Sequence, residues 1–157
     1  MIEQIFTFFT IDMIYLWLNL GIVPFWIILL FFPQSKIAGF FVTSIFPFFL
    51  FGSIYLYLIY YVFINDYNFL DSFSLYIGID ELADLFSDKN FIILFWLHFI
   101  AINLFCASWM VKDSQKLGVS KIIIFVPLLL TYFIGPVGLI VYWIIRIFAA
   151  KKISLYD

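Results

Sequence analysis

Apolar residues gather into four long runs along the chain. Each run is long enough to cross a bilayer, for which a helix needs about 20 mostly apolar residues. The runs cover about residues 11–32, 37–64, 91–111 and 122–148. Short polar segments, "PQSK" and "KDSQKLGVS", separate the first pair and the last pair. The pattern predicts an all-α membrane protein, with four transmembrane helices in a single transmembrane domain over residues 1–157.

The connection between the second and third runs, residues 65–90, carries a helical pattern of its own. Ile79, Leu82, Leu85 and Phe86 recur at helical spacing within "IGIDELADLF", and acidic residues occupy other positions around that helix. This is typical of a short amphipathic helix at the membrane surface. The alternative is a lid over a site between the helices.

Composition supports an integral, multi-pass membrane protein. The chain is 66% hydrophobic and only 11% charged, whereas the surface of a soluble domain needs far more charge. No soluble catalytic domain is expected. A net charge of −2 provides no basic surface for nucleic acid. No Lys or Arg precedes the first apolar run, so we expect this run to be retained rather than cleaved as a signal peptide.

Charge does not settle the orientation of four spans. Such a chain has both termini and the long connection on one side of the membrane. Lys and Arg are then divided four against four, and the positive-inside rule makes no choice. One side holds Lys89, Arg146, Lys151 and Lys152, and the other holds Lys36, Lys112, Lys116 and Lys121.

The third run contains polar residues that are costly in lipid unless they have partners. It ends in "FWLHFIAINLFCASWMVKDSQKLG", which holds the only histidine and the only cysteine of the chain. On a helical wheel, one arc collects His98, Asn103, Cys106, Trp109 and Asp113. Two interpretations are open. The arc either forms hydrogen bonds to neighbouring helices or forms a reactive site with His98 as acid or base.

The fourth run has a second stripe at helical spacing, formed by Thr131, Gly135, Gly138, Tyr142 and Arg146. The two glycines would let another helix, or a flat ligand, approach the backbone closely. Simple helix packing with a kink at Pro136 is the alternative. We expect Arg146 to extend to the lipid headgroups.

Several chemistries are excluded by the residues present. The chain has no phosphate-binding glycine loop and no nucleophile elbow. One His and one Cys do not make a metal shell. We therefore expect no metal and no cofactor, and any reaction would be a proton transfer.

Five motifs in order resemble the neoxanthin-synthase-like family, the plant abscisic-acid-deficient type with its bacterial and algal relatives. They are "PFWIILLFFP", "SIYLYLIYY", "DLF", "WLHFIAINLF" and "LLTYFIGPVGLIVYWIIR". The resemblance extends from about Trp17 to Arg146. Its most specific parts are Trp96-x-His98, Leu104-Phe105, Asp113 and Gly135-Pro136-x-Gly138.

The resemblance implies carotenoid biosynthesis, in which plant members are needed to convert violaxanthin into neoxanthin by opening a 5,6-epoxide to an allenic alcohol. This isomerisation needs no redox cofactor. The implied partners are a carotenoid or other polyene lipid and the lipids of a bacterial inner membrane or a thylakoid or plastid membrane. The family usually has Asp where this chain has Asn103, which leaves the reaction of this member open. The alternative is a non-catalytic pigment-binding or assembly subunit of a larger membrane complex, such as a photosynthetic one.

The resemblance also implies roles for individual residues. His98 would transfer the proton, and Asp113 or Asn103 would orient it. The residues expected to bind the substrate are Asn19, Trp96, Cys106, Trp109, Thr131, Gly135, Gly138 and Tyr142.

Overall fold

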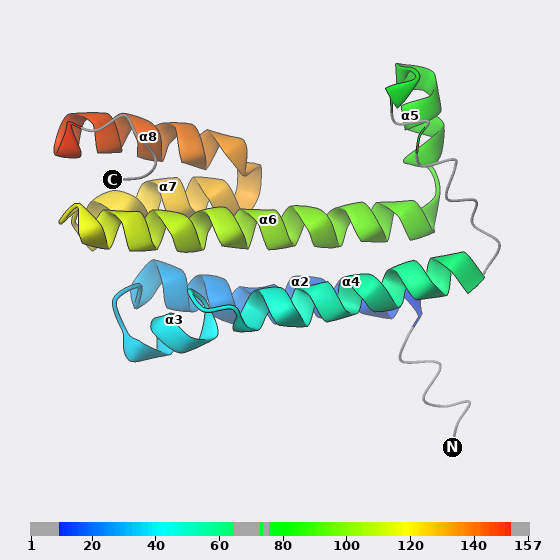
Figure 1. Cartoon of the computed structure of the whole chain (residues 1–157), viewed down its shortest axis with the longest axis horizontal. Helices are drawn as coiled ribbons and strands as arrows, with labels where there is room; N and C mark the ends of the chain where they lie inside the picture. Colours follow the sequence, from blue (N-terminus) through cyan, green and yellow to red (C-terminus); the bar gives the residue numbers. More distant parts are fainter. Residues whose placement is uncertain (1–9, 65–72, 74–75, 152–157) are drawn as a thin grey trace. The chain divides into compact units, whose positions relative to one another are not determined.

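The computed structural model of the chain describes residues 10–64, 73 and 76–151 (Figure 1). These residues form helices and turns, and none of them lies in a strand, which confirms the all-α prediction. The apolar amino terminus and residues 65–72 lie outside the described residues. The helices are α2 (Ile11–Phe31), α3 (Lys36–Phe41), α4 (Phe46–Ile64), α5 (Ile79–Leu85), α6 (Lys89–Lys116), α7 (Lys121–Ile134) and α8 (Pro136–Ala150).

The described residues divide into two compact units. Unit 1 comprises residues 10–21 and the described part of 49–100, and unit 2 comprises residues 22–48 and 101–151. Because α2, α4 and α6 each contribute to both units, the units are not successive segments of the sequence. The single domain over residues 1–157 stays a prediction.

Three apolar stretches are long enough to cross a membrane. They are α2 with 21 residues, Lys36–Tyr61 with 26 and α6 with 28. Large apolar side chains on their surfaces are exposed, among them Trp17, Phe49 and Phe105. So much exposed apolar surface is costly in water and favourable in lipid. The chain is therefore a membrane protein.

The second predicted span is interrupted near its start, because α3 ends at Phe41 and α4 begins at Phe46. Pro47 has no backbone N–H, and it disfavours helical geometry at the residue before it. A carbonyl at this break obtains its partner from another helix, since the Ser108 hydroxyl of α6 donates to the Val42 oxygen at 3.1 Å. Buried backbone groups need such partners, above all in lipid.

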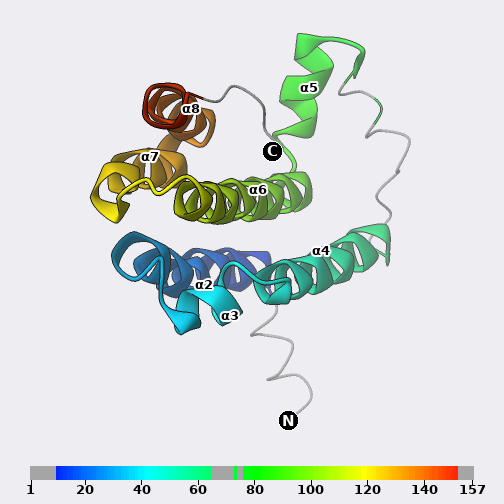
Figure 2. The same cartoon turned by 60° about the vertical axis from the view of Figure 1, so that its left-hand side comes forward.

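The fourth predicted span is not one continuous helix, and this corrects the prediction for residues 122–148. Gly135 separates α7 from α8 with φ 57° and ψ −98°. That conformation favours glycine, and Pro136 cannot donate a backbone hydrogen bond across the break. The two helices pack side by side and run in opposite directions (Figure 1 and Figure 2). They have 14 and 15 residues, short of the roughly 20 needed to cross. A fourth crossing is therefore not confirmed.

The short helix predicted between the second and third spans is present as α5. Leu85 is buried, whereas its acidic residues are exposed. Asp88 then starts α6, because its carboxylate accepts hydrogen bonds from the backbone N–H groups of Asn90 and Phe91 at 2.7 and 3.0 Å. The position of α5 at a membrane surface stays a prediction.

Candidate functional site

Most of the candidate residues lie on α6. This helix passes from unit 1 to unit 2 after Ile100. His98 therefore belongs to unit 1, together with Asn19 and Trp96. The candidates in unit 2 are Asn103, Cys106, Trp109, Asp113, Thr131, Gly135, Gly138 and Tyr142.

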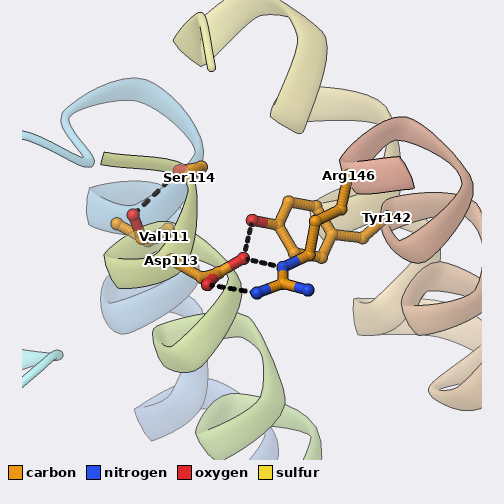
Figure 3. Close-up of polar contacts among 5 residues, drawn as sticks. All are labelled: Val111, Asp113, Ser114, Tyr142 and Arg146. Carbon is orange, nitrogen blue, oxygen red and sulfur yellow. Dashed lines mark hydrogen bonds and ion pairs between the residues drawn. The ribbon is translucent and has the colours of Figure 1, made fainter. Parts of the chain in front are cut away.

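Asp113 is the centre of a buried polar cluster in unit 2 (Figure 3). Its Oδ2 accepts a hydrogen bond from the Tyr142 hydroxyl at 2.7 Å and lies 2.7 Å from Nε of Arg146. The second carboxylate oxygen lies 3.5 Å from Nη2 of the same arginine. The exposed fractions are 0% for Tyr142, 3% for Arg146 and 8% for Asp113. Two side chains of α8 thus converge on one carboxylate of α6.

This cluster corrects the prediction for Arg146. The arginine does not extend to the headgroups, because it is buried and ion-paired with Asp113. An isolated charge in apolar surroundings is strongly unfavourable, and the pair removes that penalty only when both partners are present. Four continuous spans would place these two residues at opposite ends of the helices. The opposite charges were visible in the sequence, but their contact depends on the break at Gly135.

Asn103 is on α6, and its side chain lies beside Gly135 in the turn between α7 and α8. A Cβ atom on Gly135 would be 2.7 Å from Oδ1 of Asn103, closer than real Cβ atoms approach other atoms. The glycine therefore leaves room for the amide. Asn103 is 6% exposed, and its side chain makes no hydrogen bond to another described residue. That Asn103 orients the proton-transfer group stays a prediction.

Thr131 and Gly138 take part in the packing of α7 on α8. The Thr131 hydroxyl donates to the Pro127 carbonyl at 2.8 Å. A Cβ atom on Gly138 would collide with that hydroxyl and that carbonyl. The space in front of Gly138 is therefore filled by α7. This favours close helix packing over contact with a flat ligand at this glycine.

Trp109 and Cys106 lie one turn apart on α6. The Trp109 ring packs edge-on against Tyr142, with ring centroids 5.6 Å apart and planes at 87°. This aromatic contact helps to enclose the Asp113 cluster. Cys106 is half-buried and has a free thiol.

In unit 1, the candidate side chains have different surroundings. His98 is exposed and makes no hydrogen bond to another described residue. Asn19 donates to the Tyr15 carbonyl one turn earlier at 2.7 Å, so its amide serves its own helix. Trp96 stacks on Phe99 at 5.5 Å, and its indole Nε1 is buried without a hydrogen-bond partner. Two positions apart on a helix, Trp96 and His98 point in nearly opposite directions.

The polar arc predicted on α6 is spread along the helix axis. His98 and Asp113 are 15 positions apart, which corresponds to about 22 Å at 1.5 Å per residue. The hydrogen-bond partners found for Asp113 lie on α8, and the carboxylate is already used by them. That Asp113 orients His98 stays a prediction.

The arrangement leaves the exposed imidazole of His98 outside the Asp113 cluster. The amide of Asn103 and the indole N–H of Trp96 are unused hydrogen-bonding groups. Among the described residues, no three His, Cys, Asp or Glu side chains gather to hold a metal ion.

A family model matches most of the chain. The model of the family described as ABA DEFICIENT 4-like matches residues 13–142. This range includes every candidate residue from Asn19 to Tyr142 and ends before Arg146. No curated protein and no solved structure matches the chain.

Proposed function

The chain belongs to the ABA DEFICIENT 4-like family, which is the neoxanthin-synthase-like family, and from this membership we propose that it isomerises an epoxycarotenoid within a membrane. The family supports, in general terms, a membrane protein of the carotenoid and abscisic acid pathway. The match from residue 13 to residue 142 is the observation that carries the proposal. The protein would be multi-pass, in a bacterial inner membrane or a plastid membrane.

The reaction needs an acid and a base but no oxidant. The C–O bond of the 5,6-epoxide breaks, and its oxygen takes up a proton. A neighbouring C–H bond gives up its proton, and its electron pair becomes the new double bond of the allene. One proton enters and one leaves, so the product is an isomer of the substrate. A group that both accepts and donates a proton near neutral pH suits this chemistry.

His98 is the proton-transfer group in this proposal. Its exposure on an apolar helix supports the role, because a lipid-soluble polyene reaches such a position from the bilayer. Trp96, in the same unit as His98, has an indole N–H without a hydrogen-bond partner and stays a proposed substrate-binding residue. Tyr142 and Arg146 hold α8 on α6 through Asp113, and the proposal gives these three residues no part in the chemistry.

The test is product formation in a host that makes violaxanthin. Pigments are extracted and separated by chromatography, and the allenic product is normalised to the amount of folded protein. We expect His98→Gln to lower conversion by about 10²-fold or more, the usual contribution of general acid–base catalysis. The matched control is Ser53→Ala, which removes an exposed hydroxyl from α4 and should keep wild-type conversion. Full conversion by His98→Gln would exclude the histidine, and no conversion by the wild type would exclude the isomerase.

A second candidate function is a non-catalytic pigment-binding or assembly subunit. A specific observation favours it, since much of the predicted polar site is used in internal contacts. Asn19 bonds to its own helix, Thr131 to Pro127, and Asp113 to the side chains of α8. A carotenoid that co-purifies unchanged with both wild type and His98→Gln would support this function.

A further inference from the structure

The end of α8 returns to the end of α6. Asp113 lies three residues before the last residue of α6, and it contacts Arg146, in the eleventh position of α8. Figure 1 shows the carboxyl ends of these two helices together. A continuous helix would carry Arg146 about 36 Å away from Ile122 at 1.5 Å per residue. The 2.7 Å ion pair therefore requires the chain to turn back at Gly135.

Two short helices that turn back leave the membrane on the face where they entered. Neither α7, with 14 residues, nor α8, with 15, has the length of about 20 residues needed to cross. The exposed faces of both are apolar, with Ile122, Phe133 and Phe148 among the exposed side chains. A hairpin of this kind enters the lipid without crossing it.

Exposed lysines gather at this same end of unit 2. The Gln115 amide donates to the Pro33 carbonyl at 3.0 Å, which places the turn before α3 beside the last turns of α6. Arg146 is neutralised by Asp113, so the net charge here comes from lysines in the turn, in the last two turns of α6, at the start of α7 and after α8. They are Lys36, Lys112, Lys116, Lys121 and Lys151, all exposed.

The amino-terminal end of α6 is preceded by acidic residues instead of lysines. Lys89 begins the helix, and it is the one Lys or Arg of the described residues that lies outside unit 2. The residues just before it include Asp80, Glu81, Asp84 and Asp88. The positive-inside rule counts Lys and Arg close to the ends of spans, and here it gives a clear choice.

We propose that α7 and α8 form a re-entrant hairpin and that the five-lysine end of unit 2 lies on the cytoplasmic face, against anionic lipid headgroups. In a plastid membrane the corresponding face is the stromal one. Only α2, the α3–α4 stretch and α6 cross, so α2 begins on the opposite face and the chain ends in the cytoplasm. Clustered lysines next to spans bind anionic headgroups, and they stay on the side where those lipids are abundant.

Sided labelling of single cysteines tests this topology in a bacterial host. Cys106→Ser removes the native thiol, and one cysteine is then introduced as Gln34→Cys, as Tyr76→Cys or after Asp157. Gln34 and Tyr76 are both exposed. A membrane-impermeant maleimide is applied to sealed inside-out and right-side-out vesicles. We expect Gln34→Cys and the appended cysteine to react only in inside-out vesicles, and Tyr76→Cys only in right-side-out vesicles.

Each other pattern overturns the proposal. An appended cysteine that reacts on the side of Tyr76→Cys would show a fourth crossing, and Gln34→Cys labelled from outside would show the reverse orientation. Reporter fusions at the carboxyl terminus give the same answer without new cysteines, because a fluorescent protein should be active there and a periplasmic phosphatase inactive. These readouts do not depend on isomerase activity, so the topology and the proposed function succeed or fail separately.

Charge substitution tests the lysines themselves. Lys112, Lys116 and Lys121 together changed to Gln should give molecules in both orientations, so that Gln34→Cys reacts in both kinds of vesicle. The matched control is Lys89→Gln, which should keep the wild-type pattern. An unchanged pattern in the triple variant would show that these lysines do not set the orientation.

Discussion

At the scale of single residues, the ion pair of Asp113 and Arg146 shows what a sequence pattern states and what it omits. The sequence indicates that a carboxylate at the end of an apolar run needs a partner. It does not identify the partner, because 32 residues separate the two and the pairing depends on a turn elsewhere. His98 differs in this respect, since it is exposed, and its proposed role stays a prediction.

We expect the single variants Asp113→Asn and Arg146→Met to be strongly destabilised. Each leaves one buried charge without its partner, which typically costs about 3–5 kcal/mol. The double variant Asp113→Asn with Arg146→Met removes both charges and should lose much less than the sum of the two single variants. Thermal unfolding of the purified protein in detergent measures all three.

Tyr142→Phe is the matched control for this cycle, because it removes one hydrogen bond and keeps both charges. Its cost should be smaller, about 1–3 kcal/mol. Additive losses in the double variant, within about 0.5 kcal/mol, would mean that the two charges do not interact.

At the scale of elements, the sequence predicts which apolar stretches are helical, but it does not predict whether each stretch forms one unbroken helix. The three long apolar helices and α5 lie close to their predicted positions, since apolar length and helical spacing determine them. Residues 122–148 are apolar throughout, so hydropathy does not reveal a turn. The signal was Gly135-Pro136, which combines a residue suited to positive φ with one that cannot donate a backbone bond.

We expect Gly135→Ala to destabilise the protein. At φ 57° a side chain costs about 1–2 kcal/mol, and the new Cβ would also press on the Asn103 amide. Gly138→Ala should be at least as harmful, because its Cβ would collide with α7. The melting temperature in detergent measures both changes.

Gly52→Ala is the matched control within α4. A Cβ at this position meets nothing within 4 Å. Since alanine favours a helix over glycine by about 1 kcal/mol, this variant should be as stable as the wild type or more so. If Gly135→Ala had the same melting temperature as Gly52→Ala, the turn between α7 and α8 would not need glycine.

At the scale of the whole molecule, the class of protein and its family could be predicted from the sequence. The face of the membrane on which each end of the spans lies could not. Composition and apolar length indicate a membrane protein, and ordered motifs indicate the family that matches residues 13–142. Sidedness depends on whether the number of crossings is odd or even. In the proposed topology, the turn at Gly135 moves Arg146 and Lys151 to the other face, which changes an even division of Lys and Arg into a strong bias.

The account depends most on the return of α8 to α6, and the distance between two spin labels measures this directly. The labels are placed at Lys112 and Ile147, both exposed, in the Cys106→Ser background. A second pair at Lys112 and Phe133 is the control, because both positions come before the break at Gly135 and their separation is the same in either arrangement. Packed helices have axes 8–10 Å apart, so we expect the first pair to lie within about 20 Å. A distance of about 35 Å or more, as one straight helix over these residues requires, would contradict the account.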